Sequence, residues 1–162
     1  MPNARIVLLK GHGQDGFRFF TNYNSVKGQE LNGCTRAALV FHWKSLERQV
    51  RIKGLVERLS EADSDAYFNT RPRESRIGAW ASDQSKPLPG GLPTLNAAIA
   101  EKEREFEGLD HPLRPPHWGG FLVRPLEIEF WQAGEFRIHQ RVRWVRFSVD
   151  DTEGWVGGPL WP

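Results

Sequence analysis

The chain has 162 residues, one cysteine, seven tryptophans and a formal net charge of only +2. This length favours one domain, and the weak charge, with Lys and Arg interspersed among Asp and Glu, argues against a nucleic-acid-binding protein. A single cysteine excludes an internal disulfide and suits a reducing, cytoplasmic compartment. The sequence shows no signal-peptide pattern and no apolar run long enough to span a membrane.

The first sixty residues alternate short apolar segments with turn residues, a pattern typical of antiparallel strands. Residues 5–10 and 17–22 are predicted to form a hairpin around the turn at 12–16. Asn24 or Ser25 can cap a short helix that ends near Asn32 and Gly33. Two further strands are predicted at 37–43 and 49–59.

A helix is predicted from Ser60 to Arg71, with Ser60 as its N-cap and Pro72 ending it. Tyr67 and Arg71 are four residues apart, so they share one helical face, and Ser75 follows just beyond the end. This spacing brings a phenol, a guanidinium and a hydroxyl within reach of one phosphate group.

The rest of the chain is predicted to contain a loop at 86–93, an amphipathic helix at 94–107 and a proline-rich connector at 108–116. The last strands are expected at 121–123, 128–132 and 136–147, followed by a tail. Many short strands with a few helices, and no alternation of strand and helix, favour a mainly β, antiparallel barrel over a Rossmann sheet.

Three blocks of sequence, at 41–51, 67–85 and 129–139, mix arginines with aromatic residues. Guanidinium groups grip phosphate and also stack on aromatic planes, so the blocks suit a ligand that is both flat and phosphorylated. Together the blocks FHWKSLERQVR, YFNTRPRESRIGAWASDQS and EFWQAGEFRIH resemble the pyridoxine/pyridoxamine 5′-phosphate oxidases, flavoenzymes of vitamin B6 metabolism.

The resemblance implies a single FMN-binding domain over residues 1–162, an antiparallel Greek-key split β-barrel with peripheral helices that lacks the family's usual N-terminal segment. It also implies a homodimer with FMN at the subunit interface. The expected reaction converts pyridoxine or pyridoxamine 5′-phosphate to pyridoxal 5′-phosphate, while O2 is reduced to H2O2. No metal site is expected.

The resemblance also assigns residues to the site. Arg137 and His139 match residues over the substrate's pyridine ring and are the expected catalytic pair. The residues that match the family's contacts to the substrate phosphate are Lys10, Tyr67, Arg71 and Ser75. The residues that correspond to FMN contacts are Arg5, Ile6, Val7, Leu8, Leu9, Lys10, Phe20, Thr21, Lys27, Gln49, Gln84, Ser85, Trp131 and Arg141.

Besides the missing N-terminal segment, the chain departs from the family at Val26 and towards its C-terminus. Val26 stands where the family has an arginine that contacts the cofactor phosphate, and Gln140 replaces the usual aspartate. The ending Pro159-Leu160-Trp161-Pro162 lacks the family's C-terminal arginine, so the tail is expected to dock differently.

Each of these residues taken alone has a structural explanation, such as a solvated lysine at Lys27 or a helix-end cation at Arg71. Only the whole set, in family order and spacing, favours the ligand site. Three alternatives stay open: a related split-barrel flavin enzyme with another substrate, a non-catalytic or degraded FMN- or pyridoxal-phosphate-binding paralogue, and a tetrapyrrole-binding barrel.

Overall fold

The computed structural model describes residues 2–150 and 152–162. The chain divides into two compact units, each described here by itself. Unit 1 comprises Met1–Gly11, Arg18–Cys34 and Arg58–Leu122, and unit 2 comprises His12–Phe17, Thr35–Glu57 and Val123–Pro162. The described strands form a seven-stranded sheet. Its successive neighbours are β1 (Gly11–Gly13), β2 (Gly16–Asn22), β5 (Trp118–Gln132), β4 (Arg48–Arg58) and β3 (Arg36–Trp43). Strand β6 (Gln140–Val149) pairs with β5, and β7 (Thr152–Leu160) pairs with β6. The expectation of a mainly antiparallel β fold with peripheral helices is confirmed.

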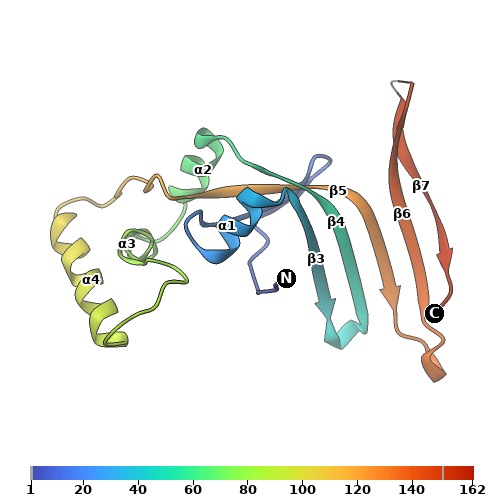
Figure 1. Cartoon of the computed structure of the whole chain (residues 1–162), viewed down its shortest axis with the longest axis horizontal. Coiled ribbons are helices and arrows are strands. Elements are labelled where there is room, and N and C mark those ends of the chain that lie inside the picture. The colour runs from blue at the N-terminus through green and yellow to red at the C-terminus, as the bar shows by residue number, and fades with distance from the viewer. Residues whose placement is uncertain (1, 151) are drawn as a thin grey trace. The chain divides into compact units, whose positions relative to one another are not determined.

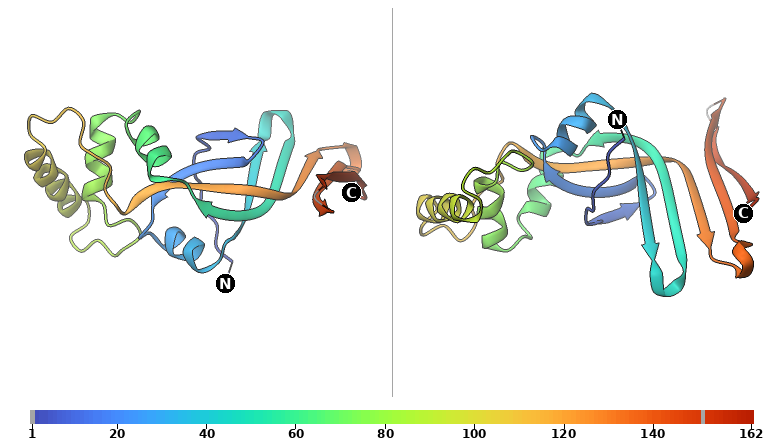
Figure 2. Two further views of the ribbon diagram at one scale, coloured as in Figure 1. Left: turned by 90° about the horizontal axis from the view of Figure 1, so that it is seen from above. Right: turned by 60° about the horizontal axis from the view of Figure 1, so that its bottom comes forward.

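Unit 1 carries the α-helices of the described chain (Figure 1). They are α1 (Val26–Gly33), α2 (Glu61–Phe68), α3 (Arg73–Ala81) and α4 (Leu92–Glu105). Helices α3 and α4 lie side by side in every view (Figure 2). The core of this unit is aromatic: Phe68 is fully buried, and Phe19 stacks on Phe121 with ring centroids 5.6 Å apart. No helix among the described residues is long and apolar enough to cross a membrane.

Unit 2 is built from antiparallel hairpins (Figure 1). Its elements are β3 (Arg36–Trp43), the 3-10 turn η1 (Lys44–Leu46), β4 (Arg48–Arg58), the 3-10 turn η2 (Glu135–Arg137), β6 (Gln140–Val149) and β7 (Thr152–Leu160). Strands β1 (Gly11–Gly13), β2 (Gly16–Asn22) and β5 (Trp118–Gln132) contribute residues to both units, and β4 has its last residue, Arg58, in unit 1.

The hairpin at the start of the chain is present but begins later than predicted. Its strands are β1 and β2, and the segment 5–9 is not a strand. The first backbone hydrogen bond of the pair runs from Lys10 N to Arg18 O at 2.9 Å. Strands need a paired neighbour, whereas the side chain of Ile6 in this segment is 96 % exposed. The apolar run therefore was read wrongly as a strand.

Helix α1 is confirmed, and Ser25 rather than Asn24 caps it, because Ser25 Oγ accepts from Gly28 N at 3.1 Å. Gly28 sits against the backbone of Tyr23, where any added Cβ would overlap the Tyr23 carbonyl group. This close approach fixes the start of α1 on the end of β2.

The predicted helix from Ser60 to Arg71 is two elements. Ser60 caps α2 as expected, with its Oγ accepting from Asp63 N at 3.0 Å. The helix ends at Phe68, where Thr70 Oγ1 donates to the carbonyl of Tyr67 at 2.8 Å. Residues before proline avoid the helical region, so Pro72 ends α2 early and, with its fixed φ, starts α3. Helix α3 was missed because Pro72 was taken only as a stop signal.

The end of the chain differs from prediction in three ways. Strand β5 is continuous, because Pro125 fits an extended backbone and forfeits only one N–H donor. The strand predicted from Phe136 begins instead at Gln140, because Phe136 and Arg137 both have left-handed backbones, with φ of 54° and 66°. The tail forms β7 and pairs with β6, although its glycines and Pro159 argued against a strand.

Candidate functional site

Unit 1 contains a cavity of about 1210 Å³ between the N-terminal segment, β2, α1 and the α2–α3 region. Thirteen of the residues that the sequence assigned to FMN or substrate line it: Arg5, Ile6, Val7, Leu8, Lys10, Phe20, Thr21, Lys27, Tyr67, Arg71, Ser75, Gln84 and Ser85. Leu9 belongs to the same predicted run but is not part of this lining. The structure thus brings together predicted residues from distant parts of the sequence; their roles remain predictions.

One part of the cavity is an aromatic stack. The rings of Phe20 and Tyr67 lie 4.0 Å apart at 21°, and Trp118 is nearly parallel to both. Arg71 places its Cζ 4.6 Å from the Trp118 ring centroid, and Lys10 Nζ is 5.7 Å from that of Tyr67. Cations beside flat apolar rings suit a ligand with an aromatic part and an anionic part. The sequence analysis missed Trp118; its position directly after a predicted connector gave no signal of a site.

Arg71 is the strongest sign of an anion site. Its Nη1 is buried and has no hydrogen-bond partner among the described residues. Burial lowers the pKa of Arg71, the phenol of Tyr67 raises it, and the charge of Arg76 lowers it further. A buried guanidinium nitrogen without an acceptor is costly, so the geometry suits an oxyanion from outside the chain.

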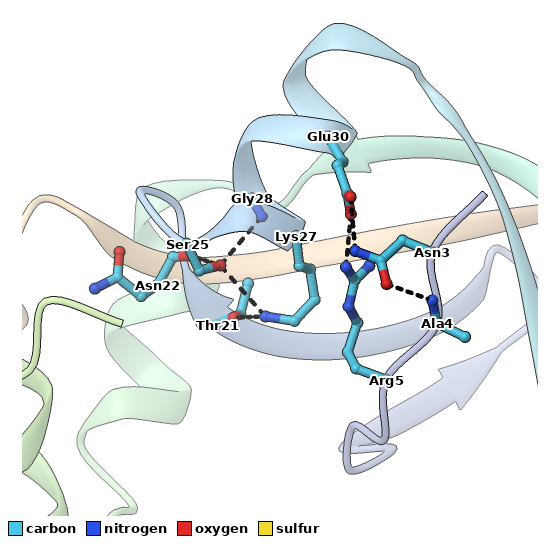
Figure 3. Close-up of polar contacts among 9 residues, drawn as sticks. All are labelled: Asn3, Ala4, Arg5, Thr21, Asn22, Ser25, Lys27, Gly28 and Glu30. Carbon is cyan, nitrogen blue, oxygen red and sulfur yellow. Dashed lines mark hydrogen bonds and ion pairs between the residues drawn. The ribbon is translucent and has the colours of Figure 1, made fainter. Parts of the chain in front are cut away.

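A second cationic group lies at the start of α1 (Figure 3). Lys27 Nζ contacts Thr21 Oγ1 and lies 3.5 Å from Ser25 Oγ. Burial and the charge of Arg5 lower the pKa of Lys27, whereas Glu30 raises it. The Lys27 ammonium is therefore held by hydroxyls in place of a carboxylate partner, which leaves its charge available to an anion.

Arg5 is oriented by α1 (Figure 3). Its Nη2 donates to Glu30 Oε2 at 2.7 Å, and Asn3 Nδ2 donates to the other carboxylate oxygen at 2.9 Å. These hydrogen bonds from Asn3 and Arg5 lower the pKa of Glu30. Sequence reasoning missed Glu30 and Asn3, because only the fold brings the N-terminal segment beside this helix.

Gln84 and Ser85 lie at the far end of the α3 region. Thr21 Oγ1 donates to Gln84 Oε1 at 3.3 Å, which joins β2 to the segment after α3. Ser85 has a left-handed backbone with φ of 76°. The pair lines the same cavity as Lys27 and Arg71.

The remaining predicted residues, Gln49, Trp131, Arg137, His139 and Arg141, belong to unit 2. The structure brings two of them together: the rings of Trp131 and His139 are 4.7 Å apart, and His139 Nδ1 accepts from Gly134 N at 3.3 Å. Gln49 pairs with His42 in the β3–β4 ladder. Arg137 is the last residue of η2, and Ile138 and His139 separate it from the start of β6.

Arg141 is held by a buried carboxylate that the sequence analysis did not single out. Glu129 is 4 % exposed and accepts from Arg51 Nη2 at 2.5 Å and from Arg141 Nη2 at 3.1 Å. Burial raises the pKa of Glu129, but the bonds from Arg141 and Arg51 outweigh it, so the net pKa is lowered. Among the described residues, no cluster of three or more His, Cys, Asp or Glu is arranged to bind a metal ion.

Comparison with known proteins assigns the family. Residues 1–101 match the family model described as pyridoxamine 5′-phosphate oxidase. Residues 118–162 match the model described as the pyridoxine 5′-phosphate oxidase C-terminal dimerisation region. The chain belongs to the pyridoxine/pyridoxamine 5′-phosphate oxidase family.

Relatives of the same family name cover the chain closely. A pyridoxine/pyridoxamine 5′-phosphate oxidase of Brucella canis is 53 % identical over 162 residues, which are 100 % of this chain and 78 % of the relative. The corresponding protein of Bartonella henselae is 51 % identical over 161 residues, 99 % of this chain and 76 % of the relative.

Two solved structures share the fold of this oxidase-family chain. PhzG from Burkholderia lata 383, in complex with tetrahydrophenazine-1-carboxylic acid, has a TM-score of 0.87 and 29 % identity over 99 % of this chain and 75 % of that one. A pyridoxamine 5′-phosphate oxidase-related, FMN binding protein of Nostoc punctiforme has a TM-score of 0.70 at 17 % identity, over 98 % of this chain and 79 % of that one. The second likeness concerns the fold alone.

If this cavity holds the phosphate of FMN, replacing Val26 by arginine should tighten FMN binding by about tenfold, because it adds one charge-assisted hydrogen bond to that phosphate. Val26 lines the cavity next to Lys27, and its side chain is 45 % exposed, so a longer side chain has room. Titration of the flavin-free protein with FMN at rising salt measures the effect, and the gain should shrink as salt screens it. An unchanged dissociation constant would show that Arg5 and Lys27 already saturate the phosphate.

Replacing Glu129 by glutamine should lower the free energy of unfolding by about 1–2 kcal/mol at pH 7, because two arginines lose their shared carboxylate. The folded-state pKa of Glu129 is lowered from its usual 4.5, so its contribution is present above the unfolded-state pKa. That contribution is lost as the pH falls through the lower folded-state pKa. Denaturant unfolding of both proteins at several pH values should show the difference vanish in acid. A difference that persists there would mean that packing, not charge, stabilises this contact.

Proposed function

We propose that this chain is an FMN-dependent oxidase that converts pyridoxine or pyridoxamine 5′-phosphate to pyridoxal 5′-phosphate, with O2 reduced to H2O2. The observation that carries the proposal is Arg71, a half-buried cation whose Nη1 is buried and unpartnered among the described residues, stacked on Trp118 in a cavity that Ser75 and Tyr67 also line. A phosphorylated pyridine offers both the oxyanion for the guanidinium and a flat ring for the aromatic stack.

The residues present also fit an FMN phosphate. Lys27 has no carboxylate among its hydrogen-bond partners in the described chain, and Arg5 keeps part of its guanidinium beyond the contact with Glu30. Thr21 and Gln84 supply polar groups beside them. FMN, when bound, would supply the acceptor for hydride from the substrate and the route for electrons to O2.

The protein's own residues would bind and orient. Lys10, Tyr67, Arg71 and Ser75 would fix the substrate phosphate, while Arg137 and His139 would lie over the pyridine ring and stabilise charge that develops there. Preorganised cations of this kind lower the barrier more than they tighten the ground state. Gln49, Trp131 and Arg141 would complete the cofactor site.

We also propose that the protein acts as a cytoplasmic homodimer with FMN at the subunit interface. The match of residues 118–162 to a dimerisation region supports this arrangement. Strands β6 and β7 of that region expose large apolar side chains, among them Trp144, Trp155 and Val156. Apolar side chains gathered on one hairpin are typical of a contact with a second subunit.

The purified protein should be yellow and hold FMN without a covalent link, two per dimer. Heat denaturation followed by filtration should release FMN into the filtrate, and light scattering should give twice the chain mass. Pyridoxine 5′-phosphate should then yield H2O2 and pyridoxal 5′-phosphate in air. FAD in the filtrate, or no flavin after reconstitution, would refute the cofactor; bound FMN without any peroxide would identify a binding protein instead.

A further inference from the structure

A second arginine, Arg76, is hydrogen-bonded to the backbone of Arg71 and has no role in the proposed function. Arg76 in α3 is 2 % exposed and is among the largest fully buried side chains of the described chain. Its Nε donates to the carbonyl of Arg71 at 2.9 Å, and its Nη2 donates to the carbonyl of Asn69 at 2.5 Å. Arg76 therefore ties the start of α3 to the turn that follows α2.

The charge of Arg76 is not neutralised by the chain. Within residues 2–150 and 152–162, no carboxylate pairs with Arg76 or Arg71, and each has a buried Nη1 without a partner. Arg76 is buried and the neighbouring Arg71 is half-buried, so the two cations repel each other and lose hydration. A fold selected for stability alone would gain by an apolar residue at position 76. Burial is the main cause of the lowered pKa of Arg71, and the charge of Arg76 lowers it further.

The turn that Arg76 holds carries Arg71 of the anion site. Arg71 lies directly before Pro72 and Ser75 lies at the start of α3; both line the cavity, and the carbonyl of Arg71 is one of the two that Arg76 binds. The Arg76 side chain itself does not line the cavity. Its effect on a ligand would therefore pass through the backbone of the turn and through its uncompensated charge.

We propose that Arg76 is a positioning residue for the substrate phosphate: its two bonds to the α2–α3 turn hold Arg71 and Ser75 in place, and its buried charge strengthens their attraction for a dianion. The inference rests on the proposed function, because it assumes that the phosphate of the substrate occupies this end of the cavity. The alternative is a purely structural role, in which Arg76 only stabilises the C-terminal end of α2, where a cation near the last carbonyls is favourable. A positioning role predicts that loss of Arg76 weakens binding of a phosphorylated ligand selectively, whereas a purely structural role predicts no such selectivity.

The test compares two ligands that the enzyme cannot oxidise, 4-deoxypyridoxine 5′-phosphate and 4-deoxypyridoxine, which differ only in the phosphate. Their dissociation constants are measured by equilibrium dialysis with the FMN-loaded parent protein, Arg76→Met and Arg76→Lys. Arg104→Met serves as the matched control, because Arg104 is an exposed arginine of α4 in the same unit. Thermal melting and flavin content establish that each variant is folded.

We expect Arg76→Met to weaken binding of the phosphorylated ligand by on the order of tenfold, with less than a twofold change for 4-deoxypyridoxine. Arg76→Lys keeps the charge but not the paired bonds, so it should fall between the parent and Arg76→Met. Arg104→Met should match the parent. If Arg76→Met does not fold, a selective loss of at least threefold in Arg76→Lys supports the inference, and its absence overturns it.

Two other results would overturn the inference in distinguishable ways. A folded Arg76→Met that keeps the parent's preference for the phosphorylated ligand, or loses both ligands equally, reduces Arg76 to a structural role and leaves the proposed function intact. A parent protein without any preference for the phosphorylated ligand removes the proposed substrate site itself, and this inference with it.

Discussion

Replacing Arg71 by alanine should raise the KM for pyridoxine 5′-phosphate by about one to two orders of magnitude while FMN occupancy stays unchanged. Loss of a charged hydrogen bond to the phosphate costs about 1.5–3 kcal/mol, which corresponds to that range. The cation–π contact of Arg71 with Trp118 at 4.6 Å holds the guanidinium at the cavity, and alanine removes this contact together with the charge. Steady-state kinetics and the flavin absorbance of the same samples measure both quantities.

Arg104→Ala is the matched control for Arg71→Ala, since it removes an exposed arginine of the same unit that does not line the cavity. It should leave KM and flavin content at the parent's values. Equal losses of substrate and flavin affinity in Arg71→Ala would show that Arg71 is a structural residue of the turn before Pro72. The phosphate would then have to be bound by Lys10, Tyr67 and Ser75.

Replacing Arg137 by alanine should slow the anaerobic reduction of bound FMN by pyridoxine 5′-phosphate about 100-fold or more, without loss of colour or of the dimer. A preorganised charged contact that strengthens in the transition state contributes on this scale. The backbone of Arg137 is left-handed, with φ of 66°, and alanine carries the same Cβ, so the change does not relieve backbone strain. Stopped-flow absorbance without O2 measures the reduction step directly.

Arg137→Lys should recover part of the rate, because it restores the charge but not the planar guanidinium. His139→Ala should have a smaller effect, because the neighbouring Arg137 still supplies the charge. The contacts of His139 with Trp131 and Gly134 also make its loss partly structural. A parent rate in Arg137→Ala would exclude this residue from the chemical step and leave His139 as the candidate.

The sequence predicted the paired strands and capped helices well wherever local signals agreed. Ser25 and Ser60 cap the helices that they were expected to cap. Errors arose where one residue type has two structural uses: Pro72 ends α2 but also starts α3, and Pro125 lies within a strand. The left-handed turn at Phe136 had no signal, since neither glycine nor asparagine marks it.

The residues of the candidate site could be predicted only where their order and spacing in the sequence match those of the family. Thirteen of the predicted residues line one cavity, although they are spread from Arg5 to Ser85. Glu30, Trp118 and Arg76 were missed because each acts on a residue distant in sequence or through a backbone carbonyl. Such contacts leave no periodicity and no motif, so only the folded chain shows them.

In helix α1, the residues that fix the position of the helix are not the ones that set the charge it presents to the cavity. Its position depends on Gly28, which no larger residue can replace without overlap with Tyr23, and on the Ser25 cap. Position 26 contributes to neither, and its side chain is half exposed at the rim of the cavity. Evolution can therefore change how strongly this helix attracts an anion by single substitutions that do not endanger folding. Val26 is a residue of this kind, and Gly28, two residues later, is the structural anchor of the helix.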